Sequence, residues 1–206
     1  MSKKKPTKPH KKKKTGKKKN AAKAKTTSFW RQPSLWIPAL VILLITAIAF
    51  SPSLENGFVN WDDDVNVLEN ENLRDFSLES IQKIFNPTTG TIIGNYNPLP
   101  IFTFLIDKEL LGGHDGKNYK PWIFHFNNLL LHLFCVFMMY RIMLLLNLSR
   151  EAAIIAALLF GIHPMRVESV AWITERKDVL LGAFYFSAIY TYIQSLRLPA
   201  KRNYYR

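Results

Sequence analysis

Long apolar stretches alternate with polar stretches along this chain. Three of them, residues 35–54, 122–146 and 179–197, approach the roughly 20 apolar residues that a membrane-spanning helix needs. A fourth, residues 151–163, holds an uncharged run of eleven residues, or about 16 Å of helix, which is short of the bilayer core. The pattern predicts an all-α integral membrane protein, a multi-span helical bundle with about four transmembrane helices.

The net charge of +13 is confined to the amino terminus of the 206-residue chain. Residues 1–25 contain 13 lysines and no acid, so the remaining 15 basic and 15 acidic residues balance. We expect residues 1–30 to form a disordered Lys-rich tail that stays cytoplasmic and rests on anionic membrane lipids. Nucleic-acid binding is the alternative, but this tail lacks the arginines and aromatic residues that read or stack on bases. No specific nucleic acid is therefore expected as a partner.

The distribution of basic residues also favours four crossings. With four spans, 20 of the 28 basic residues lie on the inner side, as the positive-inside rule requires. Both termini are then cytoplasmic, and residues 51–121 and 163–178 form outer loops. A re-entrant third segment is the alternative, and it would place the basic carboxyl terminus outside. A cleaved signal peptide at the first span is disfavoured, because the basic region is too long and Ser51–Ser53 is a poor cleavage site.

The first outer loop is acidic and long enough for local structure. Residues 77–85 show helical spacing of apolar positions after Ser77, a residue suited to capping a helix. Residues 101–111 predict a second helix, which is too charged between Asp107 and Glu109 to span a membrane and is expected to lie at its surface. The single cysteine, Cys135, excludes an internal disulfide and is interpreted as a packed apolar residue.

Polar residues at membrane depth are costly, so those in the spans are functional leads. His125, Asn128 and His132 are spaced to share one face of the second span. Hydrogen bonding between helices explains them most simply, and contact with a lipid phosphate or a substrate is the alternative. A zinc site is weakly supported, because no third ligand can be identified by spacing.

Two further clusters lie beside the spans on the predicted outer side. Asp62 and Asp63, with Asp64, suit a general base or a grip on a divalent cation, and a solvated acidic turn is the alternative. In the segment from Glu175 to Asp178, an arginine and a lysine could hold the phosphate of a lipid-linked donor, although snorkelling to headgroups explains them almost as well. The clusters converge on one face of the membrane, which indicates a site for a polar, lipid-linked substrate.

Four sequence segments, and the order in which they occur, resemble those of a known protein family. They are GFVNWDDDVNVLENENL (57–73), NYNPLP (95–100), FHFNNLLLH (124–132) and HPMRVESVAWITERKD (163–178). The chain resembles the bacterial relatives of the eukaryotic transmembrane and tetratricopeptide-repeat O-mannosyltransferases. The resemblance implies a GT-C type glycosyltransferase in the bacterial inner or plasma membrane. Such an enzyme transfers a mannose-like sugar from a polyprenyl-phosphate donor to an acceptor protein on the extracytoplasmic face.

The resemblance also assigns roles to residues of this chain. It implies that Asp62 or Asp63 acts as the catalytic base on the acceptor hydroxyl in an inverting transfer. Cationic groups would stabilise the departing donor phosphate, and the candidates are Arg176, Lys177, His125 and His132. Supporting roles fall to Asn128, His163, Glu168, Glu175 and Asp178. No metal or other cofactor is predicted, and a divalent cation is the weaker alternative.

The chain departs from that family in two ways. No 34-residue repeat is present, and the sequence stops after the fourth span although the GT-C fold needs more helices. We therefore expect residues 31–206 to be the N-terminal portion of a GT-C membrane domain and to be inactive alone. The alternative function is a non-catalytic membrane scaffold that anchors a tetratricopeptide-repeat domain. A channel or transporter is disfavoured, because the charged groups lie at the outer interface rather than at mid-membrane.

Overall fold

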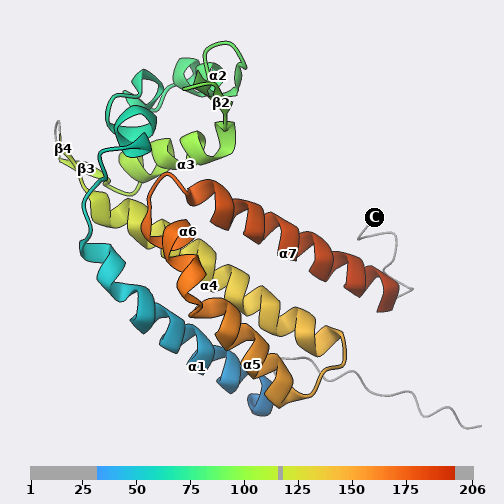
Figure 1. Cartoon of the computed structure of the whole chain (residues 1–206). Helices are drawn as coiled ribbons and strands as arrows, with labels where there is room; N and C mark the ends of the chain where they lie inside the picture. The colour runs from blue at the N-terminus through green and yellow to red at the C-terminus, as the bar shows by residue number, and fades with distance from the viewer. Residues whose placement is uncertain (1–31, 116–117, 198–206) are drawn as a thin grey trace, which may run out of the picture.

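The computed structural model describes residues 32–115 and 118–197, and helices dominate it (Figure 1). The predicted tail, residues 1–30, lies outside the described residues. In chain order the elements are α1 (Pro33–Phe50), η2 (Ser51–Glu55), η3 (Asp64–Leu68), η4 (Glu71–Leu73), α2 (Leu78–Phe85), β1 (Thr91–Ile92), β2 (Asn95–Tyr96), α3 (Pro98–Glu109), β3 (His114–Asp115), β4 (Asn118–Tyr119), α4 (Pro121–Leu145), α5 (Arg150–Gly161), η5 (Pro164–Arg166), α6 (Val167–Ala171) and α7 (Arg176–Arg197).

Three helices are long and apolar enough to cross a membrane: α1 continued by η2, α4 and α7. A fourth crossing is available if α5 and the segment Pro164–Ala171, bent by 52° at their junction, form one span. This outcome confirms an all-α membrane protein with three to four spans. In Figure 1, α1 and the α5–α6 pair run toward the segment between α1 and α4, which is drawn at the top. Helices α4 and α7 run away from it.

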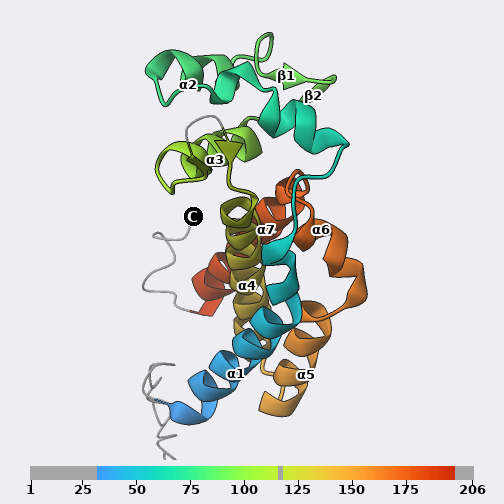
Figure 2. The same ribbon diagram turned by 90° about the vertical axis from the view of Figure 1, so that its left-hand side faces the viewer.

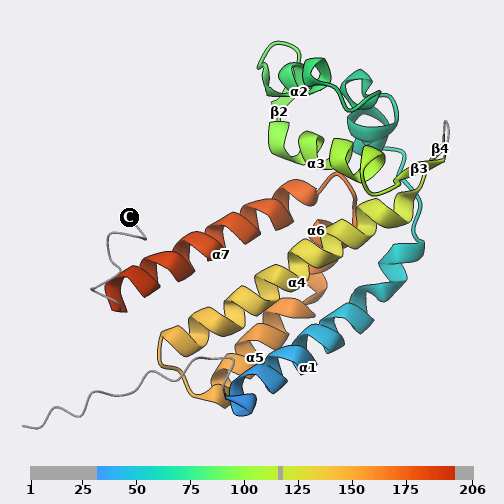
Figure 3. The ribbon, with the colours of Figure 1, turned by 180° about the vertical axis from the view of Figure 1, so that it is seen from behind.

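Helix α4 is the centre of the bundle. It packs against α1 and α5 on one side and against α7 on the other, as the views from the side (Figure 2) and from behind (Figure 3) show. The buried Tyr140 of α4 donates its hydroxyl to the carbonyl of Leu35 at 2.9 Å, which ties α4 to the start of α1. Helix α5 approaches α1 and α4 closely at Gly161, where a β-carbon would meet Thr46 Oγ1 at 2.7 Å.

The polar stretch between α1 and α4 folds into a small domain of its own, residues 56–120, which we call the loop domain. Its core is a cluster of apolar side chains from η3, η4, α2 and α3, joined by residues of α4 and of the α6–α7 connection. Ser77 caps α2 as predicted, because its Oγ accepts the N–H of Ser80 at 3.1 Å. Helix α3 is held to η4 by Lys108, whose buried ammonium donates to the carbonyls of Leu73 and Arg74.

Two features of the fold differ from the sequence pattern. Short antiparallel hairpins pair β1 with β2 and β3 with β4, although no strand was predicted. The fourth span starts at Arg176 rather than at residue 179, because a helix can begin with a charged first turn that hydrophobicity does not mark. Consequently Arg176, Lys177 and Asp178 belong to α7, and the predicted loop 163–178 is largely helical.

Candidate functional site

The candidate site surrounds the turn between α6 and α7, at the end of the bundle that faces the loop domain (Figure 1). Asn128 of α4 holds this turn, because its Nδ2 donates to the carbonyls of Trp172 at 3.0 Å and Ile173 at 3.3 Å. The Asn128 side chain is fully buried. These bonds, and the one that Asn128 Oδ1 accepts from Arg176 of α7, connect α4 to the α6–α7 segment.

Asp63 binds the same turn from the loop domain. Its Oδ1 accepts the indole N–H of Trp172 at 3.0 Å and the backbone N–H of Thr174 at 3.1 Å. The Thr174 hydroxyl donates to the same oxygen, and the N–H of Val59 donates to Oδ2 at 3.0 Å. With 1% of its surface exposed, Asp63 joins two segments more than a hundred residues apart. Its oxygens are occupied by four donors, so they do not face an open site.

Asp62, by contrast, keeps its carboxylate free. The residue is half-buried, and its side chain makes no hydrogen bond or ion pair with another described residue. It lies close enough to Lys177 for an electrostatic interaction. Next to it, Trp61 is exposed and its ring lies 6.2 Å from that of Trp172. Of the two predicted catalytic carboxylates, therefore, Asp62 is the one whose oxygens accept no hydrogen bond from the described residues.

Arg176 is buried and makes several bonds, although it also lines a groove of about 340 Å³ between α3, α4 and α7. Its guanidinium donates to Asn128 Oδ1 at 2.7 Å, to the carbonyl of Phe124 at 2.7 Å and to Thr103 Oγ1 at 3.2 Å. It also lies over the ring of Phe104, 4.5 Å from the centroid. To bind a donor phosphate, Arg176 would have to exchange these bonds. In this structure it joins α3, α4 and α7.

The ionic partner of Arg176 is Asp107 of α3, at 2.5 Å between Nη1 and Oδ2. Asn127 donates to the other carboxylate oxygen at 2.6 Å. Burial raises the pKa of Asp107 to about 6, against the opposite effect of Arg176 and Asn127. The carboxylate is therefore mostly ionised at neutral pH, and the buried pair is complete there.

Lys177 is the exposed cation of the site, with 41% of its side chain accessible and an ion pair to Glu175 at 2.8 Å. It borders an apolar groove of about 270 Å³ between the start of α3 and α7. The groove continues along α7 over Leu181 and Phe184, both of which are exposed. A cation at the end of an apolar groove suits a phosphate attached to a hydrocarbon chain.

His125 lies inside the site, between the loop domain and α4. Both of its ring nitrogens are buried and lack a hydrogen bond within the described residues. Its ring lies near the backbone of Asn56 and Gly57, and Asp63 and Arg176 are close enough to interact electrostatically. It does not border the Lys177 groove, so contact with a donor phosphate there would require a rearrangement.

The remaining predicted residues belong to α4, to the segment that contains η5 and α6, and to the first turn of α7. His132 Nε2 contacts the carbonyl of Gly161 at 2.8 Å and so connects α4 to α5. His163 is exposed, and its Nδ1 accepts the N–H of Met165 at 3.2 Å. Asp178 accepts the Ser169 hydroxyl at 3.0 Å. Glu168 is exposed and its carboxylate has no partner among the described residues.

Several residues of the site were missed by sequence reasoning. Asp107 carried a usable signal, because a single carboxylate between apolar residues of a helix needs a buried cation. Trp172 and Thr174 carried none, since nothing in their local pattern shows that a distant aspartate accepts their hydrogen bonds. Within the described ranges, no group of three His, Cys, Asp or Glu side chains is arranged to hold a metal ion.

Together the fold and the site define an α-helical membrane protein with a folded loop domain against one end of its bundle. The chain is similar to protein O-mannosyl-transferases. It is 27% identical over 186 residues to protein O-mannosyl-transferase TMTC4 of Mus musculus, covering 80% of this chain and 24% of that protein. For TMTC3 of Homo sapiens the identity is 28%, over 76% of this chain and 17% of the relative. For TMTC1 of Homo sapiens it is 35%, over 50% and 11%.

The chain thus spans between about a tenth and a quarter of the length of these curated relatives. No family model and no solved structure matches it. The similarity supports the O-mannosyltransferase-like assignment, and the roles of individual residues rest on the geometry described above.

Proposed function

We propose that this chain forms part of a membrane glycosyltransferase that transfers mannose from a polyprenyl-phosphate donor to a serine or threonine of an acceptor protein. The observation that carries the proposal is that Asp62, whose carboxylate has no hydrogen bond among the described residues, lies within electrostatic range of Lys177, and that Lys177 lines an apolar groove. The similarity to protein O-mannosyl-transferases supports the reaction type. We propose that the site faces the extracytoplasmic side and that both termini are cytoplasmic.

The geometry suits an inverting displacement. Asp62 takes the proton of the acceptor hydroxyl as the oxygen attacks the anomeric carbon, and the bond from that carbon to the donor phosphate breaks. Lys177 offsets the charge that develops on the leaving phosphate. The hydrocarbon chain of the donor lies in the groove along α7. Asp63 and Arg176 position the turn between these two groups and do not touch the reactants.

Replacement of Asp62 tests this proposal. In the intact protein, Asp62→Asn should lower mannose transfer from polyprenyl-phosphate mannose to a Ser/Thr peptide by about 100-fold or more, since general-base catalysis contributes about 10²–10⁴. Its unfolding temperature should stay at the wild-type value, because the side chain makes no bond that the amide would lose. Transfer at the wild-type rate would remove Asp62 from the mechanism.

Two neighbouring aspartates serve as controls. Asp64→Asn changes an adjacent carboxylate that has no partner within the described chain and should leave transfer intact. Asp63→Asn should instead lower the free energy of unfolding by about 1–3 kcal/mol, because an amide N–H₂ would face buried N–H donors. Equal glycan content of envelope proteins with and without the gene would favour the scaffold alternative.

A further inference from the structure

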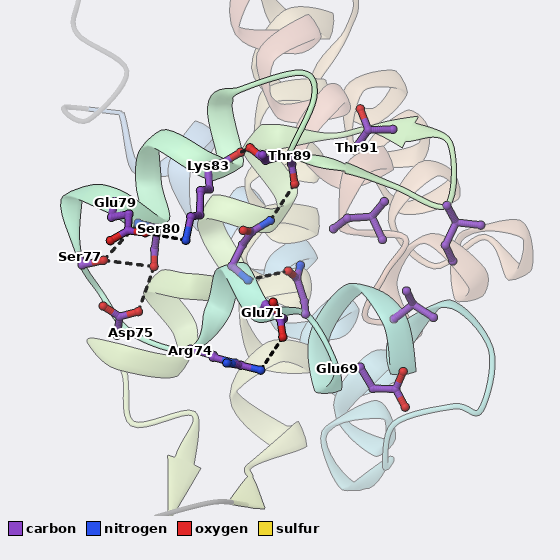
Figure 4. Close-up of a pocket in the computed structure, with 15 residues that line it drawn as sticks. Glu69, Glu71, Arg74, Asp75, Ser77, Glu79, Ser80, Lys83, Thr89 and Thr91 are labelled. Carbon is purple, nitrogen blue, oxygen red and sulfur yellow. Dashed lines mark hydrogen bonds and ion pairs between the residues drawn. The ribbon is translucent and has the colours of Figure 1, made fainter.

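A wide hollow lies in the loop domain, and neither Asp62 nor Lys177 lines it. It is an open cleft of about 620 Å³ between η3, η4, α2 and β1. Figure 4 shows that polar side chains from these elements surround it. Its volume falls within the roughly 300–1,000 Å³ range of ligand pockets, but it lacks their mostly apolar and aromatic lining. No aromatic residue is among the described residues that line it, so it resembles a polar protein interface more than a small-molecule pocket.

The charges of the cleft are unbalanced. Its lining contains four carboxylates and two cations, which gives a net charge of −2. Both cations are already paired, Arg74 with Glu71 at 2.6 Å and Lys83 with Glu79 at 2.7 Å. Glu69 is therefore left without a cationic partner among the described residues.

Asp75 is the second carboxylate without an ion pair. It accepts the Ser80 hydroxyl at 3.0 Å, and hydrogen bonds from Ser77 and Ser80 hold its pKa below the usual range. The carboxylate is therefore charged at any physiological pH. Negative charge on both sides of an open cleft favours a basic partner.

The neighbouring elements suit an extended chain. Strand β1 borders the cleft and pairs only with β2 in the described part of the protein, so it keeps one free edge. A free strand edge is a template for an extended peptide. Thr89 and Thr91 line the cleft beside this edge; their hydroxyls donate to the carbonyls of Lys83 and Pro87, so they are left to act as acceptors. Hydroxyl and carboxylate groups beside a strand edge can bind both the backbone and the polar side chains of such a peptide.

The cleft also lies near the candidate base. Val65 lines it and follows Asp62 by three positions in one helical segment. This spacing corresponds to a rise of about 5 Å. An extended chain leaving the cleft past Val65 would need only about two residues to reach Asp62.

From these observations we infer that the cleft binds an extended, basic, hydroxyl-bearing segment of the acceptor polypeptide. The inference rests on the proposed function and names the substrate feature that the loop domain selects. Residues flanking the modified serine or threonine lie in the cleft, and lysine or arginine side chains of the segment contact Glu69 and Asp75.

Peptide binding tests the inference without requiring sugar transfer. The full chain is placed in nanodiscs of neutral phosphatidylcholine. Fluorescence anisotropy then compares a labelled peptide of alternating lysine and threonine with one of alternating glutamine and threonine. The lysine peptide should bind about tenfold more tightly, and raising the salt concentration should weaken this preference.

A matched pair of variants locates the binding site. Glu69→Lys should weaken binding of the lysine peptide about tenfold, whereas Glu55→Lys, an exposed acid in η2 outside the cleft, should not change it. Neither side chain has a partner among the described residues, so both variants should fold, which circular dichroism checks. Equal binding of the two peptides, or equal effects of the two variants, would overturn the inference.

The two proposals fail separately. Charge-selective peptide binding by a protein that transfers no mannose would remove the proposed function and keep the cleft as a peptide site. Mannose transfer without charge-selective binding would keep the function and remove this role of the cleft.

Discussion

The neighbouring aspartates Asp62 and Asp63 differ in burial and in hydrogen bonding. Asp63 is buried and accepts four hydrogen bonds, whereas Asp62 is half-buried with a free carboxylate. The sequence WDDD shows a cluster of acids but cannot show which carboxylate has donors around it. Those donors come from a turn more than a hundred residues away, so only the folded chain separates the two roles.

At the scale of single residues, the Asp107–Arg176 pair predicts that the stability of the fold depends on pH. The folded pKa of Asp107, about 6, lies above the ordinary 3.8, so the folded protein keeps a proton that the unfolded chain has lost. The stabilisation from this carboxyl is complete below about pH 4 and is lost as the pH rises through about 6.

Thermal unfolding of the wild type and of Asp107→Asn, measured in detergent across this pH range, checks this expectation. The stability of the wild type relative to the variant should fall as the pH rises, because the amide does not titrate. A stability difference that stays constant, or that grows with pH, would contradict the raised pKa.

At the scale of elements, a close helix contact makes a second prediction. A β-carbon at Gly161 would lie 2.7 Å from Thr46 Oγ1 and 3.2 Å from a methyl of Val136. Gly161→Ala should push α5 away from α1 and α4 and lower the free energy of unfolding by about 1–3 kcal/mol. The unfolding temperature in detergent measures this loss.

Gly182→Ala in α7 is the matched control for this substitution. Its added methyl would meet only the Cys135 sulfur, at 3.2 Å, and a soft sulfur can shift by the few tenths of an ångström that are needed. The control should therefore cost clearly less stability than Gly161→Ala. An equal loss in both variants would mean that the α1–α4–α5 contact is not unusually tight.

Elements were predictable where one physical signal dominated. Uninterrupted apolar residues located α1, α4 and α7, and the capping serine located α2. The hairpins were not predictable, because their two-residue strands are too short to show alternation. The β1–β2 turn also places Ile93 at a φ of 48°, a conformation that β-branched residues rarely adopt.

At the scale of the whole molecule, the arrangement of helices predicts sidedness. The loop domain and the α4–α5 turn lie at opposite ends of the bundle (Figure 1). In a Cys135→Ala background, a membrane-impermeant maleimide applied to intact cells should label Glu71→Cys but not Arg150→Cys. Both positions are exposed in the structure. Labelling of both positions, or of Arg150→Cys alone, would contradict four crossings with the loop domain outside.

The proximity of the two polar segments was predictable at this scale, although the different surroundings of their residues were not. Charge asymmetry placed the acidic loop and the segment 175–178 on one side, and the structure brings Asp62 near Lys177. Arg176 and Lys177 look equivalent as neighbours in the sequence. In the first turn of α7, the Arg176 side chain is buried and the Lys177 side chain is exposed. The two differ because adjacent helical residues lie about 100° apart around the axis.

The bonds of Asp63 also set an order for assembly during synthesis. The segment that carries Asp62 is anchored only when Trp172 and Thr174 have been made, 109 and 111 residues after Asp63. At about 5–20 residues per second, translation takes about 6–22 s to cover that distance. During this interval the ribosome-bound chain holds the candidate base without its anchor. The site therefore matures only as the last described helix emerges.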